Sequence, residues 1–150
     1  MKNLPLTRPL VIAVDFDGTI VEHRAPKIGP PMPKAFETLK ALQNEGHRLI
    51  LWTYRDGDAL QEAKSFCEAH GVRFFAVNNS FPHEEYHPIM SRKINADVFI
   101  DDRNIGGFIG WEKIGELLLS NPNYKKTRKL RQRSPMPINL VMRMMNLNFF

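Results

Sequence analysis

Short apolar runs alternate with helical patterns through most of this chain. The runs that predict strands cover residues 11–14, 48–52, 73–77 and 97–100. Apolar residues at helical spacing predict helices over residues 33–42, 58–70 and 114–119, and Gly46 and Gly71 end the first two. Strands that alternate with helices predict an α/β domain with a central parallel sheet and helices on both faces.

The first strand ends in two carboxylates, Asp15 and Asp17, followed by Gly18 and Thr19. Parallel strands of this class present functional groups at their carboxyl ends, and Gly18 allows a sharp turn there. Two carboxylates this close repel each other unless a cation or a proton intervenes. Oxygen ligands in small number suit Mg²⁺. An ordinary Asp-Gly turn after a strand is the alternative.

A second apolar strand, 97–100, also ends in carboxylates, Asp101 and Asp102. If the two strands are neighbours, three or four carboxylates converge, and their repulsion requires a compensating cation. The cationic pair Arg92-Lys93 lies just upstream and is a candidate for balancing that charge.

The strand over residues 48–52 ends at Thr53, whose hydroxyl can donate a hydrogen bond to an anionic oxygen. Arg55, two residues later, is a candidate contact for the same anion.

Together these motifs resemble the haloacid dehalogenase (HAD) superfamily of phosphohydrolases. The motifs are DxDGT, a strand ending in Thr, a Lys and a strand ending in DD. The resemblance covers about residues 9–120 and is greatest to a small capless bacterial branch of sugar-phosphatase-like hydrolases. It implies a three-layer Rossmannoid fold in which the Asp15 strand lies between the Thr53 and Asp101 strands. Residues 21–32 and 78–90 are too short to form a cap domain.

The resemblance also implies roles for individual residues. Asp15 would be the nucleophile that becomes an aspartyl-phosphate, and Asp17 the general acid and base. The Asp15 and Asp101 carboxylates and the Asp17 carbonyl would hold Mg²⁺. Asp102 would ligate through water or orient its neighbour, and the choice of inner-sphere residue between Asp101 and Asp102 stays open.

Phosphate binding is the second set of implied roles. Thr53 and Lys93 would bind the phosphoryl oxygens, with Arg92 as the alternative cation, and Gly18 matches the turn beside the phosphate. His23 falls where the family has its flap. It would be either a substrate contact or an ordinary polar loop residue.

Composition favours a soluble enzyme. The N-terminus lacks the apolar stretch of a signal peptide, and no run is long enough to cross a membrane. The single cysteine, Cys67, cannot form an internal disulfide, so we expect a cytoplasmic protein with Cys67 as a core residue. A Pro-rich stretch with His83, Glu84, Glu85 and His87 has the residue types of a metal site but not the spacing, which favours a solvated loop.

A basic and then apolar tail follows the expected catalytic domain of residues 1–124. Six Lys and Arg residues between 125 and 133 exceed the net charge of +5, so the remaining surface has an ordinary balance of charge. The run could bind nucleic acid, although a solvated flexible tail is the interpretation we favour. The apolar stretches within 138–150 would pack on the core or on a second subunit of a homo-oligomer.

The sequence therefore predicts a Mg²⁺-dependent phosphomonoester hydrolase of a small phosphorylated metabolite, a sugar phosphate or a nucleotide. The alternatives are a nucleic-acid-binding HAD protein that processes phosphate ends and a non-catalytic HAD-fold binding protein.

Overall fold

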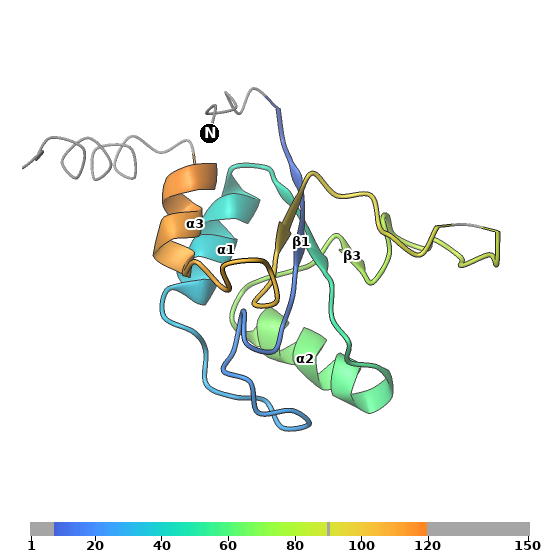
Figure 1. Ribbon diagram of the computed structural model, residues 1–150, viewed down its shortest axis with the longest axis horizontal. Coiled ribbons are helices and arrows are strands. Elements are labelled where there is room, and N and C mark those ends of the chain that lie inside the picture. Colours follow the sequence, from blue (N-terminus) through green and yellow to red (C-terminus); the bar gives the residue numbers. More distant parts are fainter. Residues whose placement is uncertain (1–7, 90, 120–150) are drawn as a thin grey trace, which may run out of the picture. The chain divides into compact units, whose positions relative to one another are not determined.

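The computed structural model describes residues 8–89 and 91–119, which form a four-stranded parallel sheet with three helices (Figure 1). The strands lie in the order β3-β2-β1-β4. In chain order the elements are β1 (Val11–Val14), α1 (Ala35–Asn44), β2 (Arg48–Leu51), α2 (Gly57–Ala69), β3 (Ala76–Val77), β4 (Val98–Ile100) and α3 (Trp111–Leu118).

Strand β1 lies between β2 and β4, as expected. Val14 is in register with Leu51 of β2 and Ile100 of β4, and all three strands run parallel. The residues that follow these strands therefore leave the sheet at the same edge, which is where parallel α/β sheets bind ligands. The predicted α/β class and the central position of β1 are confirmed.

One face of the sheet packs against the helices. Ile12, Val14, Leu49 and Leu51 share this face through the register and are fully buried. The helices also pack on one another: Phe36 of α1 contacts Phe66 of α2 at a ring-centroid distance of 5.9 Å, and α1 packs against α3. Each fully buried aliphatic side chain contributes about 1.5–3 kcal/mol, so this face forms the main core.

The opposite face is covered differently from the prediction. Ala13, Ile50 and Ala76 form a second buried cluster there with Ile94, which comes from the connection between β3 and β4. Within residues 8–89 and 91–119 this connection, rather than a helix, covers the second face. The small alanine side chains explain why an irregular segment is sufficient cover.

Element boundaries differ slightly from the prediction. Strand β3 contains two residues instead of the expected 73–77. The backbone N–H of Arg73 donates to the side-chain oxygen of Gln43, whereas that of Phe75 donates to the Leu49 carbonyl of β2. Helix α3 begins at Trp111, earlier than expected, and Cys67 is buried in α2 as predicted.

No cap domain lies within the described part of the chain. Residues 22–32, here called the flap loop, form a loop whose two ends lie side by side. The N–H of Glu22 donates to the carbonyl of Pro30, and the N–H of Met32 donates to that of Ile20. Of the helices described, none has the length and apolar character needed to span a bilayer. The tail of residues 125–150 lies outside the described residues.

Candidate functional site

Three carboxylates converge at the carboxyl edge of the sheet. Asp15 follows β1, Asp101 and Asp102 follow β4, and one oxygen from each lies within 4.8 Å of the others. The convergence follows from the pairing of β1 with β4, which continues beyond the strands as the N–H of Asp15 donates to the carbonyl of Ile100 at 2.9 Å. An all-oxygen donor set of this kind suits a hard divalent cation.

Asp102 shows the strongest sign that this cluster fits a cation. Its Oδ1 atom is buried and has no hydrogen-bond partner among the described residues, which is costly for a carboxylate oxygen unless a cation or water compensates it. Gly18, with a φ of +85°, makes room for this side chain. A Cβ on Gly18 would lie 2.9 Å from Asp102 Cγ and would collide with Oδ2.

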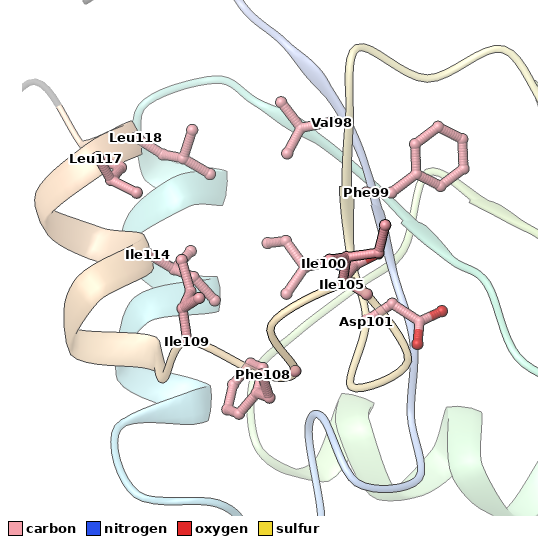
Figure 2. Close-up of a pocket in the computed structure, with 12 residues that line it drawn as sticks. Val98, Phe99, Ile100, Asp101, Ile105, Phe108, Ile109, Ile114, Leu117 and Leu118 are labelled. Atoms are coloured by element: carbon pink, nitrogen blue, oxygen red, sulfur yellow. The ribbon is translucent and has the colours of Figure 1, made fainter. Parts of the chain in front are cut away.

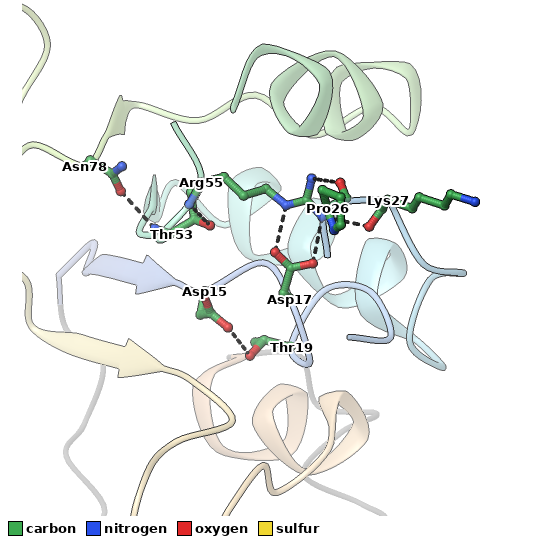
Figure 3. Close-up of polar contacts among 8 residues, drawn as sticks. All are labelled: Asp15, Asp17, Thr19, Pro26, Lys27, Thr53, Arg55 and Asn78. Atoms are coloured by element: carbon green, nitrogen blue, oxygen red, sulfur yellow. Dashed lines mark hydrogen bonds and ion pairs between the residues drawn. The ribbon is translucent and has the colours of Figure 1, made fainter. Parts of the chain in front are cut away.

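Thr19 connects the two sides of the cluster. Its buried hydroxyl donates to Asp15 Oδ2 at 2.9 Å (Figure 3) and accepts the backbone N–H of Asp102 at 3.1 Å. The indole N–H of Trp111 donates to the Thr19 carbonyl at 2.7 Å, which ties this turn to α3. Sequence reasoning placed Thr19 in the turn but missed this bridge, since nothing in the sequence pairs Trp111 with it.

Burial raises the pKa of Asp15 from its ordinary value of 3.8 to about 6. The nearby carboxylates of Asp101 and Asp102 raise the pKa further, and the hydrogen bonds from Thr19 and the Phe16 backbone oppose the rise. The negative charge of Asp15 is therefore unfavourable in this environment, and a bound cation would offset the cost.

Asp17 has the opposite environment, because its carboxylate forms a buried, two-pronged ion pair with Arg55 (Figure 3). Arg55 Nε donates to Asp17 Oδ2 at 2.7 Å, and Nη2 donates to Oδ1 at 2.8 Å. The side chains are 5% and 13% exposed, so water screens this pair weakly. A metal contribution from Asp17 would thus come from its main-chain carbonyl, as the resemblance implies.

The Arg55 guanidinium also contacts the flap loop. Nη1 donates to the carbonyl of Pro26 at 3.0 Å, Nη2 donates to that of Lys27 at 2.9 Å, and the guanidinium lies 5.0 Å from the centre of the Phe16 ring. The sequence suggested Arg55 as an anion contact, whereas its anion in this structure is Asp17.

Thr53 is held by two hydrogen bonds. Its backbone N–H donates to Asn78 Oδ1 at 2.8 Å (Figure 3), and its hydroxyl accepts the backbone N–H of Arg55 at 3.2 Å. Because the hydroxyl oxygen is the acceptor in this bond, its hydrogen can donate to a ligand. Asn78 was missed from the sequence, although an Asn directly after a strand is a signal for the left-handed backbone it adopts, with a φ of 51°.

Comparison with solved structures gives an informative likeness. A solved structure of a conserved protein from Bacteroides thetaiotaomicron is 56% identical to this chain, with a TM-score of 0.68, over 73% of this chain and 88% of that one. The two chains belong to one protein family. No protein-family model and no curated protein matches this chain. The family member is described only as a conserved protein, so its description supplies no activity.

The cations expected at the site do not pair with the cluster here. Lys93 is exposed, and within the described residues it forms no ion pair with Asp15. The Arg92 guanidinium lies 5.3 Å from the Tyr86 ring centre. His23 is exposed in the flap loop.

The second group of candidate metal ligands lies in the β3–β4 connection. Of its members, Glu84 accepts a hydrogen bond from the Ser80 backbone, and His83, Glu85 and His87 are exposed. In the described part of the chain, the residues that group as metal ligands are those of the Asp15 cluster instead.

An apolar cavity of about 250 Å³ lies between β4 and α3 (Figure 2). Val98, Ile100, Ile114 and Leu118 are among its lining residues. Asp101 also lines it, but its carboxylate points away from the side chains of α3 (Figure 2). Walls of this composition do not suit a phosphate, so the carboxylate cluster remains the candidate site.

Proposed function

We propose that this protein is a metal-dependent phosphomonoester hydrolase of the HAD type, acting through an aspartyl-phosphate on Asp15. The observation that carries this proposal is the convergence of Asp15, Asp101 and Asp102 at the carboxyl edge of the sheet. The neighbouring Asp17 and the Thr53 hydroxyl would supply the further groups that phosphoryl transfer needs.

Asp15, Asp101 and Asp102 would hold the metal, for which we propose Mg²⁺. Their oxygen-only donor set and the unpartnered Oδ1 of Asp102 support a hard cation. The bound ion would neutralise charge on the phosphoryl oxygens and on the carboxylates.

Asp15 would act as the nucleophile. One of its carboxylate oxygens forms a bond to phosphorus while the bond from phosphorus to the ester oxygen breaks. The hydrogen bond from Thr19 to Oδ2 fixes the orientation of this carboxylate. The product of the first step is an aspartyl-phosphate on Asp15 and a free alcohol.

Asp17 would transfer the protons of both steps. It donates a proton to the departing ester oxygen and then accepts one from the water that attacks the aspartyl-phosphate. The second step breaks the bond from phosphorus to Asp15 and releases inorganic phosphate. Thr53 would donate a hydrogen bond to one phosphoryl oxygen, and Lys93 would be the cation that binds another phosphoryl oxygen.

A small phosphorylated metabolite, such as a sugar phosphate or a nucleotide, is the proposed substrate class. With no cap domain among the described residues, the site edge is left to short loops such as the flap loop. The nucleic-acid alternative depends on the basic tail, which lies outside the described residues, so no observation here favours it.

The test is release of inorganic phosphate from p-nitrophenyl phosphate and from a panel of phosphorylated metabolites, with Mg²⁺ and with a chelator. We expect turnover that requires Mg²⁺ and falls to background in Asp15→Asn. Asp97→Asn is a matched control, because Asp97 lies just before β4, at the opposite end of that strand from Asp101. Absence of turnover in a protein that binds Mg²⁺, or turnover retained in Asp15→Asn, would refute the proposal.

A further inference from the structure

Arg55 makes more side-chain hydrogen bonds than any other described residue near the carboxylates. Its side chain makes four hydrogen bonds, two to the carboxylate of Asp17 and two to the carbonyls of Pro26 and Lys27. Its backbone N–H donates to the hydroxyl of Thr53. One residue thus connects the end of β2, the turn after β1 and the flap loop.

We propose that Arg55 is a positioning residue, which holds Asp17, the Thr53 hydroxyl and the flap loop in one fixed arrangement. The inference rests on the proposed function, because Asp17 and Thr53 have their roles only there. It assigns to Arg55 no contact with the phosphate, which distinguishes it from the anion contact suggested by the sequence.

The geometry argues against Arg55 as a phosphate ligand. A guanidinium has five N–H groups, and four of them are already donated to protein oxygens. To bind a phosphate with its planar fork, Arg55 would have to release Asp17 and leave that carboxylate buried without its partner, which is unfavourable. The fork geometry also explains why an arginine stands here, since lysine cannot form paired bonds to a carboxylate.

The contact with the flap loop makes the arrangement cooperative. Backbone hydrogen bonds from Glu22 and Met32 fix the two ends of the loop, and Arg55 holds the carbonyls of Pro26 and Lys27 between them. Loss of the guanidinium would therefore release the middle of the loop and the Asp17 side chain together. The backbone bond to Thr53 would remain in a substituted protein.

A double-mutant cycle tests the link to Asp17. We would measure kcat and KM for Arg55→Gln, Asp17→Asn and the double variant, with an aryl phosphate and an alkyl phosphate. An alkyl leaving group needs a proton more than p-nitrophenolate does, so we expect kcat to fall about 10²-fold or more for the alkyl phosphate in each variant. The double variant should lose little beyond either single one, as expected of residues that act as a unit.

Two further variants complete this design. Arg55→Lys keeps the charge without the fork and should restore little of the activity. Arg8→Gln is the matched control, since Arg8 forms a comparable two-pronged pair with Asp97 but is exposed, and it should leave both substrates unaffected. Additive losses that are equal for both leaving groups, with weaker inhibition by inorganic phosphate, would instead identify Arg55 as a phosphate ligand and overturn the inference.

Trypsin cleavage after Lys27 tests the loop contact without any turnover. We expect cleavage between Lys27 and Ile28, followed by mass spectrometry, to be about tenfold faster in Arg55→Gln and Arg55→Lys than in the wild type or Arg8→Gln. Equal cleavage in all four folded proteins would overturn the proposed link to the loop. If the wild type hydrolyses no phosphate ester, the proposed function fails, and the cleavage rates still decide whether Arg55 holds the loop.

Discussion

The substitution Asp15→Asn should make the metal-free protein more stable at neutral pH, although it removes the proposed nucleophile. Burial and two neighbouring carboxylates raise the pKa of Asp15 from 3.8 to about 6. A rise of about two pH units corresponds to about 3 kcal/mol. Asp15 keeps some contact with solvent, which screens these interactions and reduces the expected gain to about 1–2 kcal/mol.

The sign of the effect gives it a defined pH window. Because the folded pKa is the higher one, the unfolded chain loses the Asp15 proton first as the pH rises from about 4. Wild-type stability therefore falls, relative to that of Asp15→Asn, as the pH rises between about 4 and 6, and the difference is constant above that range. Below about pH 4 both states are protonated and the two proteins should be equally stable.

Thermal unfolding in a chelating buffer at several pH values is the assay. A gain of 1–2 kcal/mol corresponds to an increase in Tm of about 3–8 °C at pH 7.5 for a domain of this size. An asparagine can still accept the Thr19 hydroxyl through its amide oxygen, so that hydrogen bond is retained. The matched control is Asp97→Asn. The hydrogen bond from Arg8 lowers the pKa of Asp97, so removing this carboxylate should be neutral or slightly destabilising.

Mg²⁺ supplies the complementary measurement. At a concentration about tenfold above its Kd, a ligand that binds the folded state adds about 1.4 kcal/mol. The wild type should gain this stability and Asp15→Asn should gain much less. A Tm for Asp15→Asn at or below that of the wild type at pH 7.5 without metal, with no difference in pH dependence between 4 and 6, would refute the reasoning.

Three other changes test the support of the cluster. Thr19→Val should cost about 1–3 kcal/mol, because it leaves the Asp102 N–H without its acceptor, and Thr19→Ser should restore most of that loss in urea unfolding. Gly18→Ala should weaken Mg²⁺ binding measured by calorimetry, since the new Cβ displaces Asp102 and the φ of +85° strains alanine; unchanged affinity would contradict this. Trp111→Phe should lower stability by about 1 kcal/mol or more in urea unfolding through loss of the bond to the Thr19 carbonyl, and an unchanged midpoint would show that this bond contributes nothing.

The acidic cluster could be predicted from the sequence because it depends on strand order and little else. Apolar runs ending in Asp15 and Asp101 place both residues at one edge once their strands are parallel neighbours. Local patterns were sufficient for the helices too, with errors of a few residues at their ends. The segment that covers the second face of the sheet was not predictable in this way, since the residues around Ile94 have no helical or strand period.

The contacts of Arg55 could not be predicted from the sequence, for a different reason. They depend on how the flap loop returns over the turn after β1, and a loop without periodicity gives no signal for its path. The position of Arg55 two residues after Thr53 suggested an anion contact but could not identify that anion as Asp17. Contacts between irregular segments such as these are determined by tertiary packing alone.

Asp15 and Asp17 share one turn, but their carboxylates lie in opposite electrostatic surroundings. Asp17 has an internal cation, Arg55, which compensates its charge at the cost of a fixed position. Asp15 has a neutral hydroxyl and two other carboxylates as neighbours, so a cation from solution would stabilise its charge further. This division suits the proposed chemistry, in which Asp17 must keep one orientation through both proton transfers while the charge on Asp15 changes as it bonds to phosphorus.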